Sequence, residues 1–232
     1  MAADRVGAER TARHEPSQAP RVPLSRESIV RAALALVDRE GLPALSMRRL
    51  GAELGVDPMA VYYHVSNKEA LLDAIVEAVM ADIDLAVDDR GAAPEDRIMC
   101  AARAYRDAML AHPEALPIVL SRGPRTPGAM RPVELLLAIL RDAGLSPTQA
   151  MAGMNAIAAT VRGTVSMIAD GLDQDLSPEG YQQLAKQFPV EEFPNLSEAA
   201  ACNPDFIGED FDFGIRALAR GLIGSAGTGQ GA

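Results

Sequence analysis

Apolar residues recur at spacings of three and four along most of the chain, and this periodicity is typical of amphipathic helices. It predicts helices over residues 25–40, 46–54, 58–64, 67–87, 94–111, 113–120, 129–143, 147–171 and 208–223. One or two short helices, over 178–188 and 196–201, fit the proline-interrupted segment 172–207. Because no stretch alternates between apolar and polar residues with a period of two, we predict an all-α fold.

The helix boundaries before residue 70 carry recognisable end signals. Ser25 and Ser46 are candidate N-caps, and Gly55 can adopt the left-handed conformation that ends a helix. Asp57-Pro58 combines an acidic N-cap with proline at the first helical position, where the missing N–H is not needed. The run Ser-Asn-Lys-Glu at 66–69 fits a capping box and predicts the start of the next helix.

Residues 46–64 fit a helix-turn-helix motif, in which a turn through Gly55-Val56-Asp57 joins two helices. Val56 would fill the space between the helices, while Val61 and Val65 would anchor the second helix to the core. Such a second helix reads DNA when it brings small and hydrogen-bonding side chains to base edges in the major groove. The motif therefore predicts a DNA-binding element.

The run from Leu45 to Ala74 resembles the DNA-binding domain of TetR-family transcriptional repressors. The Gly-Val turn, the Tyr-x-His ending and the Asn-Lys-x-x-Leu-Leu continuation occur together, and the likeness extends over about residues 25–75. The helical remainder is similar in layout to the ligand-binding and dimerisation domain of the tetracycline-repressor branch. The resemblance implies a cytoplasmic, ligand-responsive repressor that binds a palindromic operator as a homodimer and is released by a small-molecule inducer.

These features divide the chain into four parts. We expect a disordered arm over 1–24, a three-helix DNA-binding domain with the helix-turn-helix over 25–70, a helical effector-binding and dimerisation domain over 71–224, and a disordered tail over 225–232. The net charge of −10 arises in the later part, since 71–232 holds 12 basic and 23 acidic residues while 25–70 is balanced. An acidic surface repels DNA, so contact with DNA must come from the front of the chain.

The resemblance implies that nine residues contact DNA: Ser46, Arg48, Arg49, Pro58, Met59, Ala60, Tyr62, His64 and Lys68. Arg48 would reach bases, in particular guanine, and the start of the second helix would face bases through Pro58, Met59 and Ala60, for example at thymine methyl groups. The others mainly bind phosphates, which position the domain without reading sequence. Taken alone, Arg48 and Arg49 would also fit an ordinary solvent-exposed helix face. The Tyr-Tyr-His run alone would also fit a segment that is partly buried in the core and partly at its edge.

Methionines and a few polar residues at helical spacing suggest an adaptable cavity for a small molecule. The candidate lining residues are Asp84, Tyr105, Met109, Leu136, Met151, Met154, Asn155 and Met167. Met109 and Asn155 are candidates from the helical spacing alone, whereas the resemblance also implies the other six. Plain core packing is the competing interpretation for each methionine.

The effector is expected to be an apolar or mixed small molecule. Tetracycline repressors bind a drug–magnesium chelate through a histidine after the sixth helix and a glutamate late in the eighth. The corresponding regions here, Val119–Gly123 and Ser166–Ile168, contain neither residue, so we expect no metal site and no cofactor. His112, which precedes Pro113, is expected to cap a helix end.

Helices 147–171 and 208–223 are predicted to form the dimer interface, and the resemblance implies that they pack with the partner's as a four-helix bundle. The first would approach its partner through small residues and the second through large apolar ones: Ala152, Gly153, Ala156, Ala159 and Gly163, and Phe211, Ile215, Leu218, Leu222 and Ile223. Ordinary packing within one chain is the alternative.

Other classes of protein find little support. No apolar run reaches the roughly 18 residues of a membrane span, and the polar first 24 residues lack the apolar stretch of a signal peptide. Cys100 and Cys202 have no metal-like spacing and suit a reducing compartment. Three scattered histidines and the absence of a nucleophile elbow or P-loop argue against an enzyme. An activator, or a regulator controlled by a protein partner, remains the alternative function.

Overall fold

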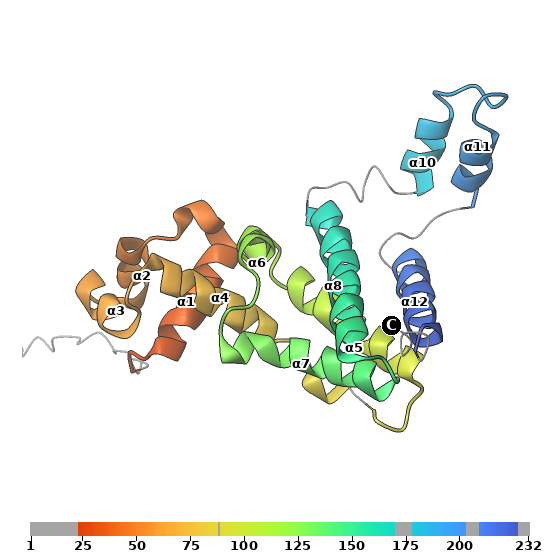
Figure 1. The fold of residues 1–232 in the computed structure, drawn as a ribbon. Helices are drawn as coiled ribbons and strands as arrows, with labels where there is room; N and C mark the ends of the chain where they lie inside the picture. The colour runs from red at the N-terminus through yellow and green to blue at the C-terminus, as the bar shows by residue number, and fades with distance from the viewer. Residues whose placement is uncertain (1–22, 88, 170–177, 203–208, 227–232) are drawn as a thin grey trace, which may run out of the picture.

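The computed structural model describes residues 23–87, 89–169, 178–202 and 209–226, and within these ranges every regular element is helical (Figure 1). The predicted all-α fold is confirmed. The α-helices are α1 (Arg26–Glu40), α2 (Met47–Leu54), α3 (Pro58–His64), α4 (Lys68–Ala81), α5 (Pro94–Leu110), α6 (Leu116–Arg122), α7 (Pro127–Asp142), α8 (Pro147–Ala169), α10 (Pro178–Ala185), α11 (Pro194–Ala200) and α12 (Glu209–Gly224). Short 3-10 helices are η1 (Leu42–Ala44), η2 (Leu85–Val87) and η3 (Pro113–Ala115).

Helices α1, α2 and α3 form a compact unit at one end of the molecule (Figure 1). α1 begins at Ser25, whose hydroxyl accepts a hydrogen bond from the Ser28 backbone N–H at 3.1 Å. Its apolar face buries Ile29, Leu36 and Val37 completely. Removing that apolar surface from water is what stabilises so small a unit. The unit packs on α4 through α1.

α4 connects the small unit to the rest of the chain, and both of its ends differ from the prediction. Its N-cap is Asn67, whose side-chain oxygen accepts from the Ala70 N–H at 2.8 Å, so the capping box predicted to begin with Ser66 is wrong. The helix ends at Ala81 rather than at 87. The Asp84 carboxylate accepts from the Ala86 N–H at 2.8 Å, and this local bond favours the separate turn η2.

The larger unit is built from α5, α7, α8 and α12, which lie beside one another (Figure 1). α7 starts at Pro127, two residues earlier than predicted, because Thr126 caps it by accepting from the Ala129 N–H. Residues 113–120, predicted as one helix, divide into η3 and α6. The core of this unit is apolar and contains Ile98, Met99, Met109, Ile139, Leu140, Ile157, Val161, Val165 and Ile215.

α12 is attached to α5 by apolar packing and by ion pairs. Arg103 Nε donates to Asp212 Oδ1 at 2.9 Å, and Arg220 Nε lies 3.0 Å from Glu95 Oε2. The guanidinium of Arg106 stacks 4.6 Å above the Phe211 ring. These contacts fix which face of α12 turns inward. Helices α10 and α11 pack on each other and stand apart from the other helices in Figure 1.

The predicted disordered ends fall largely outside the described residues, which exclude 1–22 and 227–232. At each end, two residues assigned to them belong to the fold. The Pro23 carbonyl accepts from the Ser28 hydroxyl at 3.2 Å, and Leu24 packs against the core. Ser225 accepts from Gln149 Nε2 at 3.1 Å, and Ala226 also packs on the core. No helix in the described ranges is long and apolar enough to cross a membrane.

Candidate functional site

The helix-turn-helix is held together by an unusually close approach of α2 and the start of α3. Gly51 is buried, and a Cβ added there would lie 3.0 Å from the Val56 carbonyl oxygen and 3.2 Å from the Pro58 nitrogen. A side chain at this position would require these backbone atoms to shift by a few tenths of an ångström. Gly55 follows in the left-handed region with φ of 67°, as predicted. The sequence analysis did not single out Gly51, although a glycine inside a predicted helix was the available signal.

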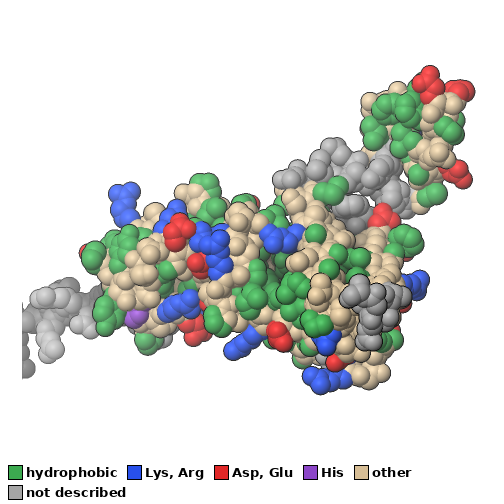
Figure 2. All heavy atoms as spheres, viewed as in Figure 1, with side chains coloured by type: hydrophobic (Ala, Val, Ile, Leu, Met, Phe, Trp, Pro, Cys, Tyr) green, Lys and Arg blue, Asp and Glu red, His purple; other side chains and the backbone are tan. Residues whose placement is uncertain are grey.

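α3 is anchored along one side and exposed along the other. Val61 and Val65 are buried, as predicted, and the Asp57 carboxylate caps the helix by accepting from the Met59 N–H at 2.8 Å. On the outer side Met59 is 72% exposed and Tyr63 is 87% exposed. With Tyr62 they give α3 an exposed face of large side chains. In Figure 2, apolar side chains and Lys or Arg side chains lie next to each other at this end of the molecule.

The remaining candidates for DNA contact surround this exposed face. Tyr62 is exposed, Pro58, Ala60 and His64 are half-buried, and His64 meets the Tyr63 ring edge-on with centroids 5.3 Å apart. Lys68 is exposed in the first turn of α4. Ser46 is the N-cap of α2, as predicted, and its hydroxyl accepts from the Arg49 N–H at 3.1 Å.

Arg48 and Arg49 differ sharply although they are neighbours. Arg48 is exposed and has no ion-pair or hydrogen-bond partner within the described ranges. Arg49 donates to Glu40 at 2.7 Å and lies 3.5 Å from a Glu53 oxygen, and the hydrogen bond from Arg49 lowers the pKa of the Glu40 carboxyl. Arg49 thus lies in an ion-pair cluster with Glu40 and Glu53, and its contact with phosphate stays a prediction.

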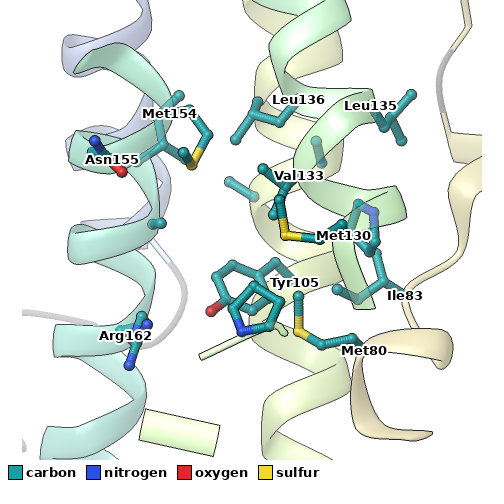
Figure 3. A pocket seen from close by; sticks show the side chains of 16 residues that line it. Met80, Ile83, Tyr105, Met130, Val133, Leu135, Leu136, Met154, Asn155 and Arg162 are labelled. Atoms are coloured by element: carbon teal, nitrogen blue, oxygen red, sulfur yellow. The ribbon is translucent and has the colours of Figure 1, made fainter. Parts of the chain in front are cut away.

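A cavity of about 260 Å³ lies in the larger unit, between α5, α7 and α8 and beside the end of α4 (Figure 3). Its walls are mostly apolar, with Met80, Met130, Val133, Leu136 and Met154 among them. A volume near the lower end of the roughly 300–1,000 Å³ typical of small-molecule sites suits a compact organic ligand.

The structure brings four of the eight predicted ligand residues together on this cavity: Tyr105, Leu136, Met154 and Asn155. It places the others elsewhere. Met109 is fully buried in the core and Met151 is 47% exposed on the outside of α8. Asp84 caps η2, and Met167 lies beyond Arg162, the last residue of α8 on the cavity.

Arg162 lines the cavity and was missed by the sequence analysis. The available signal was its spacing, since Asn155, Ala158 and Arg162 follow one another at three and four residues on α8. Burial raises the pKa of the Tyr105 hydroxyl, while the positive charge of Arg162 acts in the opposite direction. None of the described residues that line the cavity is Asp, Glu or His. This donor set does not fit a divalent-metal chelate.

His112 links the two units. Its Nδ1 lies 2.9 Å from an oxygen of Asp38 on α1, and its Nε2 lies 2.9 Å from an oxygen of Asp82 at the end of α4. His112 is the N-cap residue of η3, as predicted, but its side chain makes no capping bond and meets these two carboxylates instead. Burial disfavours the protonated imidazole, but the hydrogen bonds to Asp82 and Asp38 outweigh it and raise the pKa of His112.

The raised pKa predicts that His112 stabilises the fold more strongly at lower pH. The contribution is complete below the unfolded-state pKa of about 6.5 and disappears as the pH rises through the higher folded-state pKa. Relative to His112→Gln, the wild-type melting temperature should be higher by about 1–3 °C near pH 6 and equal at high pH. Thermal unfolding across this range tests it, with His64→Gln as the control. A constant difference at all pH values would contradict it.

The outer faces of α8 and α12 correct the predicted dimer surface. Gly153 faces inward, since an added Cβ would lie 3.1 Å from a Leu222 methyl. The large apolar residues assigned to the interface on α12 pack inside the chain, with Phe211 and Ile215 buried and the rest partly buried: Leu218, Leu222 and Ile223. The exposed stripe on α8 contains Ala152, Ala159 and Gly163, and that on α12 contains Phe213, Ala217 and Gly221.

Comparison with known proteins gives consistent matches along the chain. Residues 29–75 match the family model described as bacterial regulatory proteins, tetR family, and residues 91–223 match the tetracyclin repressor-like C-terminal domain. An HTH-type transcriptional regulator from Saccharopolyspora erythraea is 30% identical over 206 residues, which cover 88% of this chain and 86% of the relative.

Solved structures agree with this assignment of the fold. The crystal structure of apo ActR from Streptomyces coelicolor superposes with a TM-score of 0.77 at 29% identity, covering 89% of this chain and 98% of that chain. ActR in complex with actinorhodin gives a TM-score of 0.74 at 28% identity, with 89% and 100% of the two chains covered. The similarity therefore includes both the helix-turn-helix unit and the cavity-bearing unit.

Proposed function

The chain belongs to the TetR family of bacterial regulatory proteins, and on this premise we propose that it is a ligand-responsive transcriptional repressor. It binds a palindromic operator as a homodimer and is released by a small-molecule inducer. The main observation behind the proposal is the exposed face of α3, where Met59 and Tyr63 are open to solvent. The close contact at Gly51 holds this helix against α2. Residues 25–70 serve as the DNA-binding domain and 71–224 as the effector-binding and dimerisation domain.

At the operator, α3 enters the major groove. Arg48 and the start of α3, with Pro58, Met59 and Ala60, face base edges, and the mainly apolar contacts suit thymine methyl groups. Ser46, Tyr62, His64 and Lys68 bind phosphates along the groove edge. The high exposure of Tyr63 adds a residue to this set.

Dimerisation through the outer stripes of α8 and α12 places two α3 helices about a two-fold axis. Small residues on those stripes, such as Ala159 and Gly221, permit close helix approach. Two half-sites about one helical turn apart, roughly 34 Å, would then be read together. Operator affinity is high when the distance between the two α3 helices matches the spacing of the half-sites. A change in that distance lowers the affinity without altering any base contact.

The effector binds in the cavity between α5, α7 and α8. Support comes from the cavity's apolar lining and from ActR, a structural neighbour whose structure is described in complex with actinorhodin. A ligand that binds one dimer conformation better than another shifts the population toward it. Met80 and Ile83 bring the end of α4 to the cavity wall, so a bound ligand can act on the helix that leads to the DNA-binding domain.

The proposal is tested by selecting duplexes from a random pool with the wild-type protein. The selected site should be two-fold symmetric, and its affinity should fall steeply with salt concentration. Arg48→Ala should weaken binding about 10- to 100-fold, since a base contact of this kind contributes roughly 1–3 kcal/mol.

Arg131→Ala is the matched control, because Arg131 is also exposed and without a partner in the described part of the chain, but lies on α7. Its affinity should stay within about twofold of wild type. Selection of no preferred sequence, or unchanged affinity in Arg48→Ala, would contradict the assignment of α3 and Arg48 to the groove.

A further inference from the structure

The polar side chains that line the cavity are an unusual set. Tyr105, Asn155 and Arg162 come from α5 and α8, while the α7 wall is apolar (Figure 3). The Tyr105 hydroxyl points toward α8, which carries the other two. Each of the three can donate a hydrogen bond, and only Arg162 is charged. The cavity thus combines an apolar wall on α7 with the Tyr105 hydroxyl and the charge of Arg162, while Asn155, also on the lining, is exposed to solvent.

None of these three side chains has a carboxylate partner in the described ranges. Tyr105 and Asn155 make no side-chain hydrogen bonds there. Arg162 donates to the backbone carbonyl of Leu120 at the end of α6, which is a neutral acceptor. A guanidinium in partly apolar surroundings with one neutral acceptor keeps most of its charge uncompensated. An anionic oxygen is the ligand group that would compensate it best, because charge-assisted bonds to arginine are stronger and often bidentate.

Building on the proposed function, we infer that the effector is an organic acid, in which one ionised acidic group on a compact apolar body binds Arg162. The apolar body lies against Met130, Val133 and Leu136 of α7. Tyr105 and Asn155 donate to oxygen atoms of the same ligand. A neutral molecule of the same shape leaves the guanidinium without a counter-charge and binds more weakly.

The arginine that binds the acid is also connected, through α6, to α4, the helix that leads toward the DNA-binding domain. Two residues beyond Leu120, Arg122 pairs with Asp73 and Glu69 of α4 at 2.8 and 2.6 Å. α6 is therefore linked to α8 through Arg162 and to α4 through Arg122. When the acid draws the Arg162 guanidinium into the cavity, α6 loses its bond to α8 while it remains paired with α4. The charge of the ligand thereby changes how firmly α6 holds α4 in place.

Two dyes that differ mainly in one acidic group provide the test: 1-anilinonaphthalene-8-sulfonate, which is anionic, and N-phenyl-1-naphthylamine, which is neutral. Fluorescence titration of the full chain should show tighter binding of the anionic dye. Arg162→Met should weaken binding of the sulfonate at least about tenfold and leave the neutral dye within about twofold. Arg162→Lys, which keeps the charge, should restore part of the lost affinity.

Arg141→Met is the matched control. Arg141 also donates to a backbone carbonyl, that of Leu145, but it does not line the cavity. Both dyes should bind this variant as they bind the wild-type protein. Equal loss of both dyes in Arg162→Met would indicate a purely structural arginine and overturn the inference, as would unchanged binding of the sulfonate.

Failure of the inference and failure of the proposed function give different results. If the neutral dye binds as tightly as the sulfonate, the cavity remains an effector site and only its preference for acids is wrong. If neither dye binds, both the inference and the effector part of the proposed function are wrong, whereas the DNA test with Arg48→Ala is unaffected. Hydrogen exchange in residues 116–123 should increase with the sulfonate and not with the neutral dye; no increase would contradict the link through Leu120.

Discussion

Gly51→Val should abolish sequence-specific DNA binding while the cavity-bearing unit stays folded. Even one added Cβ at this position would lie 3.0 Å from the Val56 carbonyl oxygen and 3.3 Å from the Pro58 Cα. These neighbours are backbone atoms, so they cannot move away by a change of rotamer. Valine adds two more methyl groups and must push α3 from α2. Overpacking of this kind typically destabilises by about 1–3 kcal/mol.

The displaced α3 would no longer present its side chains in register with the groove. We therefore expect operator affinity to fall at least about 100-fold in Gly51→Val, and by less in Gly51→Ala, on a duplex selected by the wild-type protein. Ala52→Val is the control, since it places the same β-branched residue at an exposed position of the same helix. Circular dichroism and dye binding would show that the cavity-bearing unit is intact. Wild-type affinity in Gly51→Val would contradict the described packing of α2 and α3.

Local chemistry explains why the helix-turn-helix boundaries could be predicted. Ser46, Gly55 and Asp57-Pro58 act through bonds or backbone angles within a few residues, and each ends or starts a helix in the structure as expected. The start of α4 shows the limit of such signals. Ser66 and Asn67 are both residue types that cap helices, and the structure uses Asn67.

The cavity was harder to predict because periodicity shows that a helix has an apolar face but not what that face meets. Met109 and Met154 were both predicted to line a cavity, yet the first packs in the core and only the second lines it. The same limit applies to α12, whose Phe211 and Ile215 pack within the chain while Phe213 is 76% exposed. Only the packing of α12 on α5 decides between these faces.

Ion pairs between distant residues were also beyond the sequence analysis. Nothing adjacent distinguishes Arg48 from Arg49, and the difference arises because Glu40 at the end of α1 lies beside Arg49. His112 likewise meets Asp38 and Asp82, which are far from it in the sequence. In both places the decisive partner comes from another helix.

The account depends most on α3 lying in the DNA groove, and photocrosslinking tests this directly. Benzoylphenylalanine introduced at Tyr63, the most exposed aromatic position of α3, should crosslink efficiently to a DNA strand in the complex with the selected duplex. The same group at Phe213, on the outer stripe of α12, should instead join two protein chains. Crosslinking of Tyr63→benzoylphenylalanine to DNA is the predicted result. A fully formed complex in which position 63 gives no DNA adduct, while position 213 does, would show that another surface binds the operator.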